Sequence, residues 1–454
     1  MRNSLALITA VRGDKNPSAF LRALRKMVIA LATLAVVPAM AAPQQPPTQK
    51  LTLNEAEAMA LKNHPLVQAA TYDARAAEQL TREAKSAYYP AAEGNLTGAG
   101  AGPVHNARID AGFLNDPHVF NRYSNGLEVK QLITDFGRTS NMVASTRYGA
   151  QAASKNEQQT EQDVLLAVNR AYFGVLRAQA LLKVADETVK ARQILADQIT
   201  ALEKNKLKSL VDVAFAQVDL AKAKLMLVQS QNDVKAAYAE LANALGLASP
   251  QPFELVDEPL PAPPPADPTD LVAAALQNRP DLASARFSHE AALKYARAER
   301  DLWMPTVSAV GAAGLTPLHE APLSDHYEAA GINVKIPIFN GFLFSARHQE
   351  ASLRAQAADQ AQRDLADRIS RDVRVAWANA VTAYQNLDVT AQLLKQATLA
   401  LDLSQGRYKL GLASIVELSQ AQLNLTQAQI DNTNAQYGFQ IQQAMLTYQT
   451  GMLH

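Results

Sequence analysis

The chain has 454 residues, of which 48% are hydrophobic and 6% aromatic, so it is long enough for a large core or for two domains. It contains no cysteine, which excludes disulfides, thiolate metal sites, a cysteine nucleophile and a lipidated N-terminal cysteine. Residues 1–41 hold six of the 43 basic and one of the 43 acidic residues. The remaining 37 basic and 42 acidic residues give a net charge near −5, which argues against nucleic acid as a partner.

Residues 1–41 have the pattern of a signal peptide for export. A basic region precedes the apolar segment 27–37, and an A-x-A cleavage site follows at 39–41. The apolar segment is too short to span a bilayer permanently, although a retained membrane anchor is the alternative. The long segment before Met27 leaves both Met1 and Met27 open as the start. With no other run of 18 apolar residues, no transmembrane helix is expected, and the protein is predicted to be periplasmic, secreted or in an outer membrane.

Residues 42–248 are predicted to form one structural unit. A helix is expected over 53–88, with Thr52 and Asn54 as capping residues and Pro90 as its stop. The later elements of this unit are two strands and two long helices, over residues 91–102, 127–133, 138–203 and 209–245. A short polar break separates the two long helices, so they are expected to form a hairpin.

Residues 269–454 repeat this unit after the Pro-rich linker 249–268, which is expected to run as an extended strap. Leu202–Gly246 aligns without a gap to Arg407–Gly451, with 12 identities over 45 residues. The elements of the second copy are a helix capped by Asp267 and Thr269 and stopped by Pro305, two strands and two long helices, over residues 268–303, 306–315, 332–338, 343–405 and 414–450. The chain is therefore two copies of one unit.

The predicted helices are unusually long and carry two apolar sides. At 1.5 Å per residue, the helix over 138–203 would be about 100 Å long, which is typical of a coiled coil or a rod-like assembly. The last helix has one apolar stripe at spacings of three and four, formed by Leu418, Ala421, Leu425, Ala428, Asn432, Ala435 and Phe439. A second stripe recurs every seven residues, at Val416, Leu423, Ile430 and Tyr437. A helix in a closed wall needs two such seams; a plain antiparallel bundle is the alternative.

The strand-like segments alternate between apolar and polar residues. The pattern is clean over 332–338 and weaker over 127–133, and Pro337 fits a strand end better than a strand centre. Such alternation is typical of outer-membrane barrel strands, but a soluble, half-buried hairpin is equally compatible with it. Four strands cannot close a barrel, so membrane strands would require several chains to share one.

In five segments the sequence resembles the TolC family of outer-membrane efflux proteins. They are LNEAEAMALKNHPLVQAA (53–70), LVAAALQNRPDLASAR (271–286), VKQLITDFGR (129–138), VKIPIFNGF (334–342) and RYKLGLASIVELSQAQLNL (407–425). The resemblance implies a mainly α fold with a small transmembrane β part. In this family, long antiparallel helical hairpins form a trimeric α-barrel tunnel, and four strands per chain form a shared 12-stranded β-barrel.

The resemblance also implies a function, partners and a location. The chain would be an exit duct in the cell outer membrane, with its helices in the periplasm. It would work as a homotrimer with a periplasmic adaptor and an inner-membrane pump, exporting small molecules. Two alternatives remain open: the outer-membrane component of type I protein secretion, and a soluble periplasmic coiled-coil scaffold.

Two sets of site residues follow from the resemblance. The hairpin tips would contact the adaptor, through Lys206, Leu207, Lys208 and Ser209 in the first copy and Gly411, Leu412, Ala413 and Ser414 in the second. The first copy departs from the family's Gly-Leu pattern, since two lysines flank Leu207. In the second copy, the alternative is that Gly411 serves only as a turn residue. The periplasmic gate would be formed by Glu417, Gln420 and the first-copy equivalent Asp212.

The gate assignment has its own alternative and a departure from the family pattern. Glu417 and Asp212 are also first-turn acids, which the helix dipole favours. Gln420 stands where some members of the family have a second acid, which predicts a weaker or differently built gate.

The sequence contains no other pattern that indicates a reaction. His105 and His118 lie in one predicted external loop and His319 and His326 in the other, but their spacing is weak evidence for a metal site. No catalytic triad order, HExxH motif or nucleotide-binding loop occurs. We therefore expect no enzyme activity, no cofactor and no metal.

Overall fold

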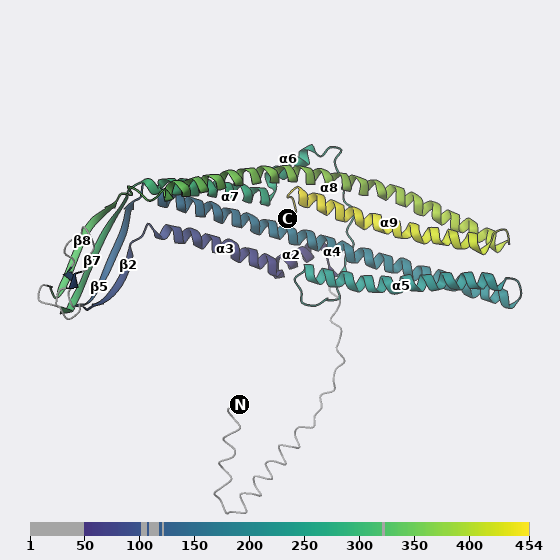
Figure 1. The fold of residues 1–454 in the computed structure, drawn as a ribbon. Helices are drawn as coiled ribbons and strands as arrows, with labels where there is room; N and C mark the ends of the chain where they lie inside the picture. Colours follow the sequence, from purple (N-terminus) through teal and green to yellow (C-terminus); the bar gives the residue numbers. More distant parts are fainter. Residues whose placement is uncertain (1–49, 101–106, 109–117, 120–121, 320–322, 454) are drawn as a thin grey trace, which may run out of the picture. The chain divides into compact units, whose positions relative to one another are not determined.

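The structure is a computed structural model that describes residues 50–100, 107–108, 118–119, 122–319 and 323–453. The predicted signal peptide lies outside the described residues, as does His105. Figure 1 shows the four-stranded sheet at one end of the long helices and the tips of the helical hairpins at the other. In the described part of the chain, no helix combines the length and the apolar character that a membrane span requires.

Each predicted first helix is in fact two helices. In the first copy α2 covers Leu53–Asn63 and α3 covers Pro65–Ser86, so the expectation of one helix over 53–88 is wrong. His64 between them is extended, with ψ 124°, because a residue before proline is pushed out of the helical region. In the second copy α6 is Thr269–Asn278, α7 is Pro280–Arg300, and the short 3-10 helix η1 covers Asp301–Trp303.

The predicted capping residues are partly right. Thr52 is the N-cap of α2 and forms a capping box with Glu55, but Asn54 lies inside the helix. In the second copy the N-cap is Pro268, without a side-chain bond, and Asp267 Oδ1 accepts a hydrogen bond from the Thr269 backbone N–H at 2.9 Å. Asp267 therefore supports the first turn from one position before the N-cap, and Thr269 is the first helical residue.

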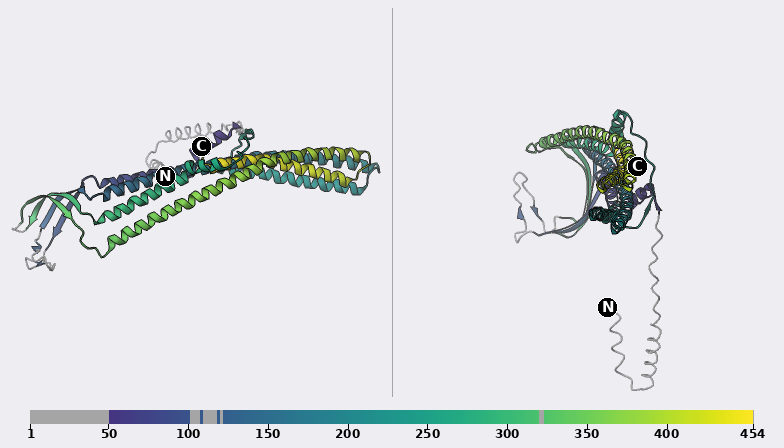
Figure 2. Two further views of the ribbon diagram at one scale, coloured as in Figure 1. Left: turned by 90° about the horizontal axis from the view of Figure 1, so that it is seen from above. Right: turned by 90° about the vertical axis from the view of Figure 1, so that its right-hand side faces the viewer.

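The four long helices are close to their predicted positions. They are α4 (Arg138–Lys204), α5 (Leu210–Ala244), α8 (Leu343–Lys409) and α9 (Ile415–Gln449). The helix α8 extends one turn beyond the expected end at 405. The hairpin α4–α5 and the hairpin α8–α9 lie side by side, since α9 contacts both α4 and α5 (Figure 2). On α9, Leu418 and Phe439 of the first predicted stripe are buried, whereas Val416 and Leu423 of the second are exposed.

The four main strands form one antiparallel sheet in the order β2-β5-β7-β8. They cover Ala91–Ala99, Arg122–Thr134, Thr306–His319 and His326–Lys335, and two short strands, β3 (Ala107–Arg108) and β4 (His118–Val119), pair with each other. The last strand ends at Lys335, so Pro337 lies beyond the strand and the expected end at 338 is wrong.

The sheet has one apolar and one polar face. Leu127 is opposite Ala313, and Ala309 is opposite Ile332, which puts these four residues on one face. The other face carries the polar residues Asn95, Ser124, Glu128, Lys130, Ser308, Asn333 and Lys335. Leu127 and Ile332 are 64% and 70% exposed, so no described part of the chain covers the apolar face at these positions.

The Pro-rich linker is an extended strap that crosses both hairpins. Its strand β6 (Glu254–Leu255) pairs in parallel with β1 (Lys50–Leu51). The hydroxyl of the fully buried Tyr172 on α4 lies 2.6 Å from Val256 O and 2.9 Å from Leu51 O. Further donors to strap carbonyls come from the three other long helices, namely Tyr238, Gln440 and Trp377.

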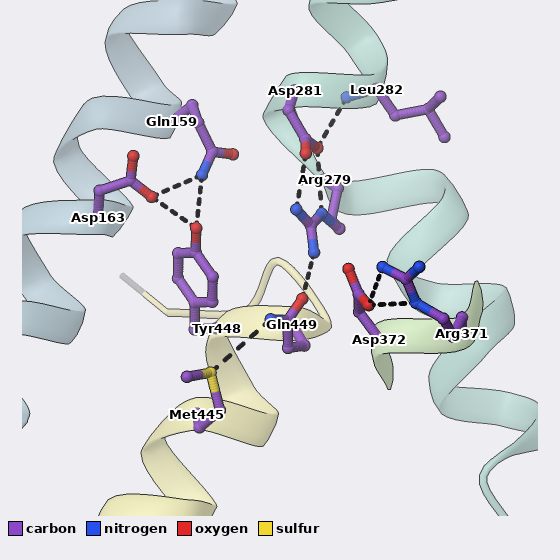
Figure 3. A network of polar contacts seen from close by, with 10 residues as sticks. All are labelled: Gln159, Asp163, Arg279, Asp281, Leu282, Arg371, Asp372, Met445, Tyr448 and Gln449. Carbon is purple, nitrogen blue, oxygen red and sulfur yellow. Dashed lines mark hydrogen bonds and ion pairs between the residues drawn. The ribbon is translucent and has the colours of Figure 1, made fainter. Parts of the chain in front are cut away.

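The end of α9 is joined to the break between α6 and α7 by a polar network (Figure 3). The guanidinium of the buried Arg279 donates to Gln449 Oε1 and pairs with Asp281 at 2.6 Å. The neighbouring Tyr448 hydroxyl donates to Asp163 Oδ1 on α4 at 2.6 Å. Gly451 has a positive φ of 71° and packs against the backbone of Arg279, where a Cβ would come within 3.0 Å. The network therefore connects the start of the second repeat, at the α6–α7 break, and its end, after α9, to α4.

Candidate functional site: the hairpin tips

The first tip turns through a lysine in the left-handed conformation. The helix α4 ends at Lys204, and Lys206 has a φ of 57°. Two hydrogen bonds close the turn, from Lys206 N to Glu203 O at 2.7 Å and from Leu207 N to Leu202 O at 2.9 Å. This pattern is a Schellman motif, which satisfies the last carbonyl groups of the helix.

The second tip has the same geometry with glycine at the turn. Gly411 has a φ of 75°, and Leu412 N donates to Arg407 O at 2.8 Å. A Cβ on Gly411 would meet nothing within 4 Å, so backbone conformation alone favours glycine here. The difference between Lys206 and Gly411 therefore adds a charge to the first tip without changing its turn, at a conformational cost of about 1 kcal/mol.

Both tips lead into capped helices. Ser209 and Asp212 form a capping box at the start of α5, with Ser209 Oγ 2.9 Å from Asp212 Oδ2. Ser414 Oγ accepts from Glu417 N at 3.2 Å at the start of α9. The predicted helix starts at Ser209 and Ser414 are thus N-caps, and the acids three residues later stabilise the first turn.

The three predicted gate residues are engaged within the chain. Glu417 Oε1 lies 3.3 Å from Arg407 Nη1, and both side chains are partly exposed. Gln420 Nε2 donates to Asn424 Oδ1 at 2.9 Å. Asp212 is used by its capping box, so each of the three side chains contacts a residue outside the predicted gate.

The eight predicted tip residues differ in exposure. Leu207 and Leu412 are 69% and 67% exposed, although they are large apolar residues at the ends of polar hairpins. Lys208 and Ala413 are half-buried, and the other four are exposed. Among these eight residues each tip has one exposed leucine, flanked by lysines only in the first copy, and the neighbouring Leu210 and Leu410 are exposed as well, at 73% and 75%.

Two contacts between the hairpins were not predicted from the sequence. Lys208 Nζ lies 4.0 Å from the centroid of the Tyr408 ring, which is a cation–π contact between the first tip and α8. Ser419 on α9 donates a hydrogen bond to Asp219 on α5. Around these contacts a buried apolar cluster joins the hairpins through Ala196, Ile199, Ala216, Leu220, Tyr408, Ile415 and Leu418. In the sequence, the aromatic residue Tyr408 within the repeated segment is the only indication of these contacts.

A buried cation lies beside this cluster. Arg192 on α4 is 7% exposed, and burial lowers the pKa of its guanidinium more than the charge of Asp219 raises it. The Nη1 atom of Arg192 has no hydrogen-bond partner. An arginine guanidinium stays protonated throughout the physiological pH range. The space between the hairpins therefore contains a positive charge that is not fully paired.

The loop histidines form no metal site in the described residues. His319 Nε2 lies 2.7 Å from Asp325 Oδ1, and His118 belongs to the short strand β4. No cluster of three or more potential ligands among histidine, aspartate and glutamate occurs in the part of the chain that the structure describes.

Comparison with known proteins gives a consistent result. The model of the family described as "Outer membrane efflux protein" matches residues 58–247 and 271–452. The chain is 23% identical over 409 residues to "Outer membrane efflux protein BepC" of Brucella suis biovar 1, covering 88% of this chain and 86% of that protein. It is 24% identical over 422 residues to "Outer membrane protein TolC" of Salmonella enteritidis, covering 89% and 84%.

Solved structures agree with the fold. A crystal structure of CusC, described as showing changes that accompany folding and transmembrane channel formation, superposes with a TM-score of 0.77 at 20% identity. The match covers 91% of this chain and 97% of that one. The structure of VceC from Vibrio cholerae superposes with a TM-score of 0.74 at 18% identity, covering 88% and 96%.

Proposed function

The chain belongs to the family of outer membrane efflux proteins, and from this premise we propose that three copies of it form the exit duct of a tripartite export system. In this proposal the strands of all copies form one barrel in the outer membrane. The helices form a tunnel in the periplasm, and an adaptor connects the tunnel to an inner-membrane pump that supplies the energy. The duct exports small molecules and carries out no reaction of its own.

The observation that carries the proposal is the open sheet. In its order β2-β5-β7-β8, the outer strands β2 and β8 each have a neighbour on one side only among the described residues. All ten residues of β8 are exposed, as are eight of the nine residues of β2. Unpaired strand edges are not tolerated in hydrocarbon, so an apolar-faced sheet in a membrane must be closed by other strands. Four strands per chain and three chains give a barrel of twelve.

The helices support the same assembly. On α3 the side chains of Leu66, Tyr72 and Leu80 are 61%, 66% and 56% exposed, and on α8 Leu353, Val389 and Leu403 are 57% to 61% exposed. Val416 and Leu423 of the second α9 seam are also exposed. Apolar faces on several helices of one chain are expected when neighbouring copies cover them.

A reconstitution experiment tests the duct. The purified chain is expected to fractionate with the outer membrane, to have the mass of a trimer in detergent, and to produce conducting channels in planar bilayers. Recovery only from the soluble periplasmic fraction, without conductance, would favour a periplasmic scaffold and overturn the proposal.

The tips are proposed to contact the adaptor, and Glu417, Gln420 and Asp212 to form the gate once three chains surround one axis. The exposed Leu207 and Leu412 support the first assignment, because Leu210 and Leu410 beside them are exposed too, and apolar side chains gathered on an exposed surface mark sites of contact with other proteins. Leu207→Asn and Leu412→Asn are expected to reduce adaptor recovery in a pull-down. Leu225→Asn is the matched control, since Leu225 on α5 is 72% exposed away from the tips. Equal recovery from all three variants would exclude the tips as the contact.

A further inference from the structure

The two repeats of the chain are equivalent in three dimensions, residue by residue. The bounds of α8 are those of α4 moved by 205 residues, and β7 begins 215 residues after β2. The strand pairing follows the same two shifts. Ala91 is opposite Lys130 in the first repeat, and their equivalents under the shifts, Thr306 and Lys335, are opposite each other in the second. A contact between the repeats can therefore be transferred from one repeat to the other.

The junction between the repeats is formed on one side and open on the other. Within the chain, β5 of the first repeat pairs with β7 of the second, and Val129 is opposite Gly311. The equivalent strands are β8 and β2, which are the two edges of the sheet in the described part of the chain (Figure 1). The two shifts put Val334 of β8 opposite Leu96 of β2. A sheet of four strands cannot close on itself, so only a second copy of the chain can form this pair.

The transferred register keeps both faces of the sheet continuous. Val334 and Leu96 belong to the apolar face and are 52% and 75% exposed. The next pair is Asn333 opposite Thr97, and both residues belong to the polar face. A slip of one residue would put apolar side chains beside polar ones on each face. The alternation excludes every odd slip, and the internal junction selects one register from those that remain.

The polar face of the first repeat carries an acid pair that needs cations. Glu93 is directly opposite Glu128 on the neighbouring strand, and like charges in that position are unfavourable. Lys130 faces Ala91, so it lies one diagonal step from Glu93 and within reach of its carboxylate. The chain thus supplies one lysine on one side of the acid pair, whereas the other side of Glu93 is the open edge of β2.

The matching lysine of the second repeat has uncharged neighbours on its paired strand. Lys335 is the equivalent of Lys130, and it faces Thr306 with Ser308 on the diagonal. In the transferred register Lys335 lies opposite Asn95 of the second copy and one diagonal step from Glu93 of that copy. A cation at the open edge of β8 and an acid at the open edge of β2 therefore complement each other only between chains.

The helices show the same correspondence. Tyr148 on α4 stacks against Phe287 on α7 with 6.4 Å between the ring centroids, which is a contact between the repeats. The equivalent positions are Leu353 on α8 and Tyr72 on α3, and these side chains are 57% and 66% exposed. The contact that the repeats make inside the chain is thus open where α8 and α3 face outward, and both residues there are large and apolar.

We propose that β8 of one copy pairs with β2 of the next in this register, with Val334 opposite Leu96 and an ion pair between Lys335 and Glu93 of the next copy. Leu353 packs against Tyr72 of the next copy. The contact is head-to-tail, because it joins two different edges, and such a contact forms a ring when its rotation closes. The inference rests on the proposed duct and adds which residues meet between the copies.

Cysteine pairs test the register, since the chain has no cysteine of its own. Val334→Cys with Leu96→Cys and Asn333→Cys with Thr97→Cys are oxidised in lipid nanodiscs and separated on a non-reducing gel. Hydrogen-bonded and non-hydrogen-bonded pairs alternate along antiparallel strands, so one of the two variants has its Cβ atoms close enough for a disulfide. That variant is expected to give covalently linked trimers.

Matched controls move one cysteine by two residues on the same face. Val334→Cys with Gly94→Cys and Asn333→Cys with Asn95→Cys should cross-link at least about tenfold less, because diagonal neighbours are too far apart for a disulfide. More cross-linking in these controls than in the predicted pairs would overturn the register. Covalent dimers from Val334→Cys alone would show β8 against β8 and overturn the head-to-tail order.

A charge exchange tests the ion pair without cysteines. Lys335→Glu should shorten the half-life of the trimer in detergent by about 1.5- to 5-fold for each interface, the range for exposed ion pairs. Adding Glu93→Lys should restore the half-life, and Lys62→Glu on the exposed side of α2 should leave it unchanged. A double variant no longer-lived than Lys335→Glu would overturn the ion pair. These results leave the duct intact if the unmodified chain is trimeric and conducts, whereas loss of both properties would overturn the duct and the interface together.

Discussion

Replacing Tyr172 with phenylalanine should weaken the attachment of the strap to the helices where β1 and β6 pair. The Tyr172 side chain is fully buried, and its hydroxyl is within hydrogen-bonding distance of Val256 O and Leu51 O. Phenylalanine fills nearly the same space and leaves these carbonyl groups without that donor. The cost of losing a donor to a buried acceptor is about 1–3 kcal/mol, which equals an approximately 5- to 150-fold increase in local opening.

Hydrogen–deuterium exchange of the reconstituted protein measures this effect. Amides of β1 and β6 and the Val256 N–H, which donates to Leu51 O at 3.1 Å, should exchange faster by that factor, whereas the tips should not change. Tyr437→Phe is the matched control, because the Tyr437 hydroxyl is 3.4 Å from the Asp257 side chain and its loss should change exchange little. Unchanged exchange of the strap in Tyr172→Phe, or an equal increase throughout the chain, would refute the reasoning.

Three further outcomes are expected. Burial raises the pKa of Tyr172 to about 12. The stability that the neutral Tyr172 side chain contributes is therefore complete below the unfolded-state pKa of 10 and is lost as the pH rises through about 12. Alkaline unfolding followed by circular dichroism should show a shallower loss of stability in Tyr172→Phe. Gly411→Ala should destabilise the second tip by about 1 kcal/mol, and Lys206→Gly should stabilise the first tip by a similar amount, as measured by amide exchange. Stability changes of the same sign in the two variants would contradict the shared left-handed turn. Glu417→Ala should weaken channel block by multivalent cations in planar bilayers, and unchanged block would exclude Glu417 from the gate.

Sequence periodicity predicted the long elements because their ends have local causes. The helix starts at Leu210 and Ile415 follow Ser209 and Ser414, whose side chains cap their own helices. The break at His64 was missed, although Pro65 causes it locally, because the apolar periodicity continues across it. From sequence alone, Pro65 is compatible with one continuous helix and with the start of a second helix, and the conformation of the preceding residue decides between them.

The contacts between the hairpins could not be predicted from the sequence. Ser419 and Asp219 are 200 residues apart, and Tyr408 and Lys208 are equally distant, so no spacing rule relates them. Arg192 lies in a polar stretch of α4 and has the pattern of a solvated residue. Its burial depends on how α8 and α9 pack against α4, which is a property of the assembled chain.

The sequence by itself determined the repeat, the extent of the long helices, the alternation of the strands and the position of both turns, because each depends on neighbouring residues and on hydrophobic period. Only the tertiary structure decided which side chains lose their contact with water. It put Arg192, Tyr408 and Gln422 into one cavity wall and, within the described ranges, left β2 and β8 as the edges of the sheet. The physical reason is that burial and pairing depend on the packing of distant segments, whereas helix ends and strand alternation depend on local backbone conformation.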